Sequence, residues 1–102
     1  MTTPAPAKMA PAAGDPDLSL TAVTRVIGRH IPFYLNYAPT YHATLLRSLH
    51  EIWDRGHTSV LDVGGGTGII AQAMKELFAI PRVVSVDVHD RFLGTLDIEA
   101  RT

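Results

Sequence analysis

Three glycines at alternate positions constrain the fold of this chain more than any other feature. Gly64, Gly66 and Gly68 follow the short apolar run Val60–Val63 and precede a segment whose apolar residues recur at helical spacing. Glycine has no Cβ, so it adopts positive φ and lets another group approach the backbone closely. A glycine turn between a buried strand and a helix is typical of open α/β sheets, which bind ligands beyond the carboxyl ends of their strands.

The residues on either side of the glycines predict one strand–helix–strand unit. The run Val60–Val63 predicts a buried parallel strand. Apolar residues at spacings of three and four predict a helix from Thr67 to Phe78, and Pro81 stops it. The run Arg82–Val88 predicts the second strand. Residues 59–88 therefore have the length of a right-handed crossover between two adjacent parallel strands.

The remainder of the chain divides into a tail and two upstream helices. Residues 1–17 are rich in Ala and Pro and predict an extended, disordered tail, so the folded part is expected to span residues 18–102. Helical patterns run from Leu18 to His30 and, with Thr40 as the expected N-cap, to about Arg55. No further element is predicted after Arg91.

Asp87 lies at the end of the second predicted strand. Adjacent parallel strands end at the same edge of a sheet, so its carboxylate is expected beside the glycine turn. An ionised carboxylate has acceptor sites for two ribose hydroxyls. The pattern predicts a ribose between the glycine turn and Asp87.

The segment Val60–Gly68 resembles the first motif of class I S-adenosylmethionine-dependent methyltransferases. That motif is an apolar pair, an acid and an apolar residue followed by G-x-G-x-G, and Asp87 resembles the family's acidic residue at the end of the second strand. The resemblance implies a Rossmann-like α/β fold, S-adenosylmethionine as cofactor and methyl transfer as the reaction. The cofactor-binding residues that it implies are Asp62, Gly64, Gly65, Gly66, Gly68, Asp87 and Val88.

The resemblance also implies a role for each of these positions. The backbone of Gly64–Gly68 would face the ribose and methionine portions of the cofactor. Asp62 would lie near the methionine end, where it fixes the loop or meets the ammonium group directly or through water. Asp87 would bind the ribose hydroxyls, and Val88 would supply an apolar surface near the adenine.

A nicotinamide or flavin dinucleotide site is the nearest alternative. Its G-x-G-x-x-G/A fingerprint is matched formally by Gly66–Ala71, with Asp87 following. Asp62 argues against it, because a dinucleotide site usually has only apolar residues at that strand end. The glycines also begin earlier than the fingerprint requires. A P-loop is excluded, since no Lys-Ser/Thr pair follows the glycines.

The part of a methyltransferase that selects the acceptor is not expected in these residues. In the family those groups come from later strands, so no catalytic residue is assigned and the methyl acceptor stays open. Two parallel strands with both edges open would leave backbone groups unpaired. The chain is therefore expected to be the N-terminal part of a longer methyltransferase or, alternatively, a noncatalytic truncated remnant.

The composition of the chain limits the binding partners, metal sites and cellular location that can be expected. The net charge of −1 gives no electrostatic indication of nucleic-acid or membrane binding, although it does not rule out a nucleic-acid acceptor. The chain has no Cys, and its five His form no H-x-x-x-H pair, so no metal site is predicted. No apolar stretch approaches the roughly 18 residues of a membrane span. A cytoplasmic location is the expectation.

Overall fold

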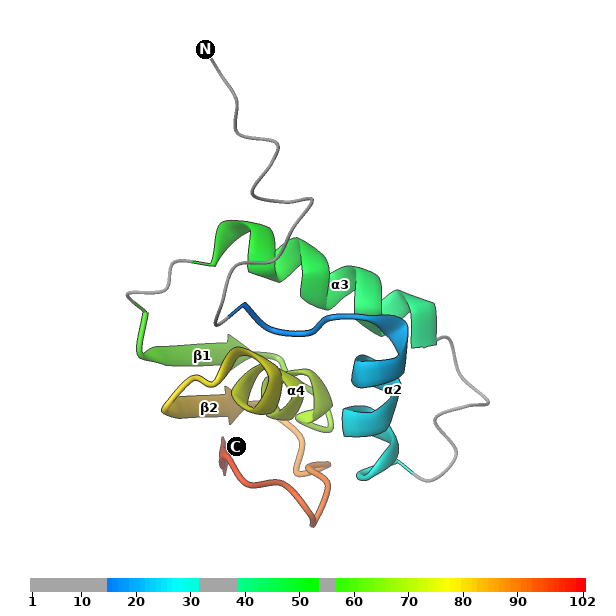
Figure 1. Ribbon diagram of the computed structural model, residues 1–102. Coiled ribbons are helices and arrows are strands. Elements are labelled where there is room, and N and C mark those ends of the chain that lie inside the picture. The colour runs from blue at the N-terminus through cyan, green and yellow to red at the C-terminus, as the bar shows by residue number, and fades with distance from the viewer. Residues whose placement is uncertain (1–14, 32–38, 54–56) are drawn as a thin grey trace.

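The computed structural model describes residues 15–31, 39–53 and 57–102. They form a small α/β fold of helices packed on a parallel sheet (Figure 1). In chain order the elements are α2 (Leu20–Gly28), α3 (Pro39–Ile52), β1 (Ser59–Val63), α4 (Ile69–Phe78), β2 (Arg82–Val86) and β3 (Glu99–Arg101).

The two upstream helices begin with clear local signals. Ser19 caps α2, because its side chain accepts a hydrogen bond from Ala22 N at 3.2 Å. Pro39 occupies the first position of α3, where its missing N–H costs nothing. Thr40 therefore lies inside α3, and its predicted role as N-cap is wrong. The helix ends at Ile52, and the predicted end at Arg55 lies outside the described residues.

Helix α4 begins at Ile69, two residues later than predicted. Gly68 has φ of +83°, so the chain is in the left-handed region there and cannot belong to a right-handed helix. The helix ends at Phe78, as predicted, and the next residue, Ala79, is also left-handed with φ of 56°. The prediction of a parallel strand–helix–strand unit is confirmed, with α4 as its crossover.

The sheet has the order β1-β2-β3, and both pairs of strands are parallel. Val60 lies opposite Val83 in the first pair, and Val84 lies opposite Glu99 in the second. Strand β3 was not predicted, and the expectation that the outer edge of the second strand stays open is wrong. The segment Glu99–Arg101 lacks an apolar pattern, and it becomes a strand because β2 offers it a row of backbone partners.

The helices pack on one face of the sheet. Helix α4 packs on β2, α2 packs on α4, and α3 contacts both of these helices. Val83 and Ser85 point into this layer and are buried. Among the described residues, the largest fully buried apolar side chains are Val23, Ile27, Leu46 and Ile80.

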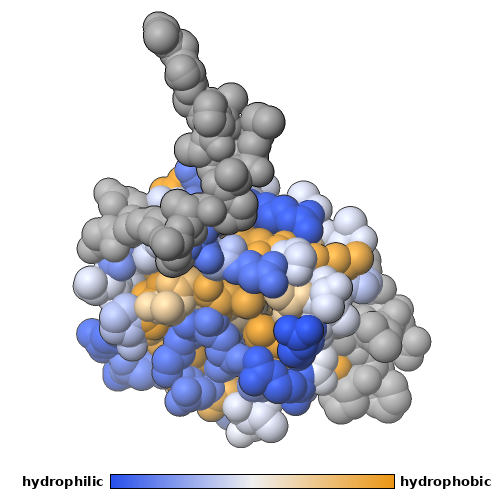
Figure 2. Space-filling view, viewed as in Figure 1, coloured by the Kyte–Doolittle hydropathy of each residue, from blue (hydrophilic) through white to orange (hydrophobic). Residues whose placement is uncertain are grey.

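The opposite face of the sheet carries exposed apolar side chains. Leu61 is 63% exposed and Val63 is 76% exposed, while Val84 and Val86 on the neighbouring strand are half-buried. Parallel sheets usually have both faces covered, but within the described part of the chain the helices pack on one face. Figure 2 shows the side of the molecule on which α4 lies in front of the strands, and there a band of hydrophobic residues crosses the middle, with hydrophilic residues below it.

The N-terminal tail and membrane-spanning helices are the two remaining features on which the sequence gives a prediction. The predicted tail over 1–17 lies outside the described residues except for 15–17, and in that stretch Asp17 Oδ1 accepts a hydrogen bond from Ser19 N at 3.0 Å. Among the described residues, no helix is long and apolar enough to cross a membrane.

Candidate functional site

The predicted glycine turn is a loop over residues 64–68 at the carboxyl edge of the sheet. Gly64, Gly66 and Gly68 have φ of +74°, +62° and +83°, a region that L side chains rarely adopt. Gly64 N and Gly65 N both donate to Val86 O, at 2.7 and 3.2 Å, and so tie the start of the loop to the end of β2. A Cβ added at Gly64 or Gly66 would meet nothing within 4 Å. The backbone at these two positions is therefore open to a ligand.

Asp87 lies against this loop, as the sequence predicts, but its carboxylate faces backbone groups of the protein. Asp87 Oδ2 accepts a hydrogen bond from Gly66 N at 2.8 Å, and Oδ1 accepts one from His89 N at 2.9 Å. The side chain is only 7% exposed, and the Arg91 guanidinium lies 3.9 Å from Oδ1. Each carboxylate oxygen has two acceptor sites, so one site on each remains beyond these two bonds.

The surroundings of Asp87 favour its charged form. The N–H groups of His89 and Gly66 hold the pKa of Asp87 below its ordinary value, and the charge of Arg91 adds to their effect. A carboxylate in this environment is ionised at neutral pH. It therefore presents a permanent negative charge to the loop.

Asp62 contributes a second carboxylate beside the loop. It lies on β1 opposite Ser85, and the Ser85 hydroxyl is 3.4 Å from Asp62 Oδ2. A Cβ added at Gly65 would lie 2.5 Å from Asp62 Oδ2 and 2.1 Å from Ser85 Oγ. Gly65 is therefore required because the loop backbone passes so closely over these two side chains.

The pKa of Asp62 moves in the opposite direction to that of Asp87. Burial raises the pKa of Asp62, the hydrogen bond from Ser85 opposes the rise, and the negative charge of Asp87 reinforces it. Two carboxylates thus lie against one short backbone loop. Their shared negative charge favours a ligand that carries positive charge.

Gly68 has a different neighbourhood from the other loop glycines. A Cβ at this position would lie 2.6 Å from Leu96 Cδ1 and 3.4 Å from Phe92 Cδ1. Leu93 N also donates to Thr67 O at 3.1 Å. The end of the loop is therefore covered by the connection between β2 and β3, so it is not available to a ligand in the way that Gly64 and Gly66 are.

The structure brings most of the predicted site residues together. Asp62 lies beside Gly65, and Asp87 binds Gly66, whereas Gly68 faces the β2–β3 connection. Val88 follows β2 at the same edge, and its side chain is 87% exposed.

The residues that cover Gly68 were missed by sequence reasoning. Phe92, Leu96 and Ile98 lie in a connection without helical or alternating spacing, so no periodic signal could have identified them. Over the described ranges, no group of three or more His, Cys, Asp or Glu side chains could hold a metal ion.

Comparison of the chain with protein-family models, with curated proteins and with solved structures gave no match.

Proposed function

We propose that this chain binds S-adenosylmethionine through the glycine loop and serves an S-adenosylmethionine-dependent methyltransferase. The observation that carries the proposal is the placement of Asp62 and Asp87 against a loop whose backbone has open space beside Gly64 and Gly66. The resemblance of Val60–Gly68 to the first methyltransferase motif supports the same ligand. The structure contains a parallel strand–helix–strand unit. The proposal adds that this unit belongs to a Rossmann-like fold.

Electrostatics favours this ligand over a dinucleotide. S-adenosylmethionine carries a sulfonium and an ammonium group, and both are attracted by nearby carboxylates. The pyrophosphate of NAD or FAD is doubly negative, and Asp62 beside the glycine loop would repel it, whereas Asp87 can bind a ribose in either class of ligand. The Arg91 side chain is 62% exposed and its guanidinium lies 3.9 Å from Asp87 Oδ1, so it screens the charge of Asp87 only in part.

The proposal gives each residue a definite task. Gly64 and Gly66 present backbone to the ribose and methionine portions, and Asp62 meets the ammonium end. Asp87 uses its remaining acceptor sites for ribose hydroxyls, and the exposed Val88 side chain packs on the adenine. The cofactor would supply the methyl group, bound to a sulfonium sulfur. No acceptor class and no catalytic residue are assigned to this chain.

Calorimetry on the 102-residue chain tests the proposal. Titration with S-adenosylmethionine and with its demethylated product should show binding, and NAD should bind more weakly or not at all. Tighter binding of NAD would favour the dinucleotide alternative. Absence of binding by all three compounds would favour a noncatalytic remnant that retains the loop.

Two isosteric substitutions sharpen the test. Asp87→Asn removes an acceptor and a charge, and should weaken binding by roughly tenfold or more because hydrogen bonds to charged groups are strong. Asp90→Asn makes the same charge change at an exposed neighbouring position and should leave affinity within about twofold. Equal affinities of the two variants would refute the role of Asp87.

Asp62→Asn separates the two ligand classes by the sign of its effect. If the ligand places an ammonium group at Asp62, the substitution weakens binding. If the ligand places a pyrophosphate there, removal of the negative charge strengthens binding. The direction of the change is therefore decisive even where its size is small.

A further inference from the structure

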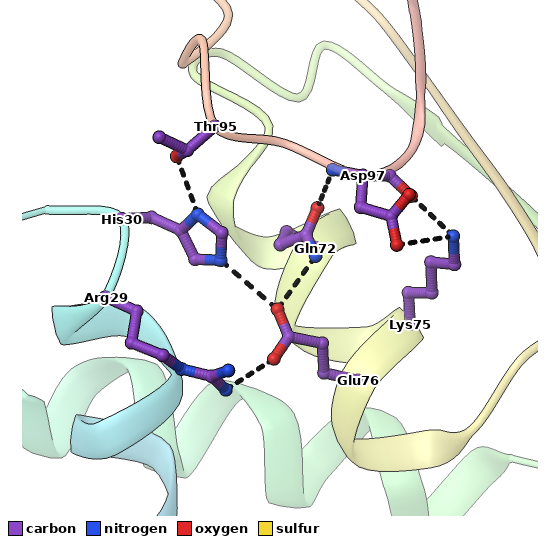
Figure 3. Close-up of polar contacts among 7 residues, drawn as sticks. All are labelled: Arg29, His30, Gln72, Lys75, Glu76, Thr95 and Asp97. Carbon is purple, nitrogen blue, oxygen red and sulfur yellow. Dashed lines mark hydrogen bonds and ion pairs between the residues drawn. The ribbon is translucent and has the colours of Figure 1, made fainter.

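A cluster of polar side chains lies beside α4 and joins three parts of the chain (Figure 3). We call it the α4 polar cluster. Its members are Arg29 and His30 at the end of α2, Gln72, Lys75 and Glu76 on α4, and Thr95 and Asp97 in the β2–β3 connection.

Gln72 is the buried centre of the α4 polar cluster. Its side chain is held in the core at 2% exposure, and its amide bonds in two directions. Gln72 Oε1 accepts from Asp97 N at 2.7 Å, and Nε2 donates to Glu76 Oε2 at 2.8 Å. A backbone N–H can only donate, so the bond to Asp97 fixes which end of the amide is the oxygen. Gln72 thus anchors the β2–β3 connection from inside the molecule.

Glu76 and His30 add a second attachment to the same connection. Glu76 pairs with the Arg29 guanidinium and lies 3.2 Å from His30 Nε2. His30 Nδ1 in turn lies 2.7 Å from Thr95 Oγ1. The end of α2 is therefore linked both to α4 and to the connection. Lys75 on α4 donates a further hydrogen bond to Asp97 O in the connection.

The connection held in this way reaches the end of the glycine loop. Leu93 N donates to Thr67 O at 3.1 Å, and Leu96 Cδ1 occupies the space beside Gly68. Leu96 directly precedes Asp97, and the backbone N–H of Asp97 donates the hydrogen bond that Gln72 Oε1 accepts. A continuous series of contacts therefore runs from Gln72 through the connection to Thr67 and Gly68.

We propose that Gln72 is a positioning residue for the glycine loop. It holds Asp97, keeps the β2–β3 connection seated on Thr67 and Gly68, and thereby fixes the end of the loop in the geometry that a ligand meets. The effect on ligand affinity rests on the proposed function, whereas the effect on the loop itself does not.

Amide hydrogen exchange on the 102-residue chain without ligand tests the effect on the loop. Gln72→Met keeps a similar length and removes both hydrogen bonds. The probes are two backbone N–H groups. Gly68 N–H donates a hydrogen bond to Gly65 O, and Leu93 N–H donates one to Thr67 O. The internal reference is Gly64 N–H, which donates a hydrogen bond to Val86 O on β2. We expect protection of the two probes to fall about tenfold relative to the reference, because local opening is governed by local contacts.

Met74→Ala is the matched control for a merely structural effect. Met74 lies on the same helix, is 8% exposed and packs in the apolar core. Its truncation should lower protection generally and leave the ratio of Gly68 to Gly64 unchanged. An unchanged ratio in Gln72→Met as well would overturn the proposal.

Thr95→Val provides a second route if Gln72→Met does not fold. Thr95 is exposed, and valine keeps its shape while removing the hydroxyl that meets His30. We expect the same selective loss of protection at Gly68, and we expect Thr95→Ser to restore it. Equal ratios in Thr95→Val and Thr95→Ser would count against the positioning role.

The ligand experiment then separates the two proposals. If the wild-type chain binds the demethylated cofactor, Gln72→Met should bind it more weakly, and equal affinity would contradict the positioning role. If the wild-type chain does not bind it, the proposed function fails, and the exchange ratios still decide the role of Gln72.

Discussion

Replacement of Gly68 by alanine tests how the glycine loop fits under the β2–β3 connection. Gly68 has φ of +83°, and an added Cβ would lie 2.6 Å from Leu96 Cδ1. A left-handed L residue costs about 1–2 kcal/mol, and a side chain forced into a filled site costs about 1–3 kcal/mol. Alanine recovers about 0.4–1 kcal/mol by restricting the unfolded chain. We therefore expect Gly68→Ala to lower the free energy of unfolding by roughly 2–4 kcal/mol.

Gly64→Ala is the control, because it carries the backbone cost without the steric one. Gly64 has φ of +74°, and a Cβ there would meet nothing within 4 Å. Its expected loss is about 1 kcal/mol.

The free energy of unfolding of both variants can be measured by urea titration with tryptophan fluorescence as the signal. Trp53 is the single tryptophan, and its ring centroid lies 6.0 Å from that of Phe78. Equal losses in Gly68→Ala and Gly64→Ala would refute the packing of Leu96 on Gly68.

Ala79→Gly should raise the free energy of unfolding by about 1 kcal/mol in a urea titration, because Ala79 has φ of 56° at the end of α4. Burial raises the pKa of Asp62, so the stability associated with its protonated form is present below pH 3.8 and lost as the pH rises through the folded-state pKa. Asp62→Asn should therefore be more stable than the wild type at pH 7 but not at pH 3, and a reversed order would contradict the assignment. Arg82 and Arg101 lower the pKa of Glu99 to about 2, so the stability from this group is present above its ordinary pKa of 4.5 and lost as the pH falls toward 2. Wild type should lose more stability than Glu99→Gln between these pH values, and about 1 M salt should reduce the difference.

The sequence was sufficient to predict which residues form the candidate site, but not which atoms those residues contact. The glycine spacing and the two strand ends are sufficient to predict that Asp62 and Asp87 lie at one edge of the sheet. That the Asp87 carboxylate binds Gly66 N and His89 N depends on how the loop folds back, and residue order does not contain this information. Likewise, only the packed structure shows that Gly65 is required by its close approach to Asp62 and Ser85.

The elements that could be predicted from residue order are those whose signals are local. An apolar run, a glycine turn and helical spacing were enough for β1, α4 and β2, because burial on one or both faces imposes a period that the residues record. Strand β3 and the α4 polar cluster form only when the chain packs on itself. Glu99–Arg101 pairs only because β2 has a free edge, and Gln72 meets Asp97 only after the connection returns over α4. Both features depend on contacts between segments far apart in the chain, and such contacts leave no period in the sequence.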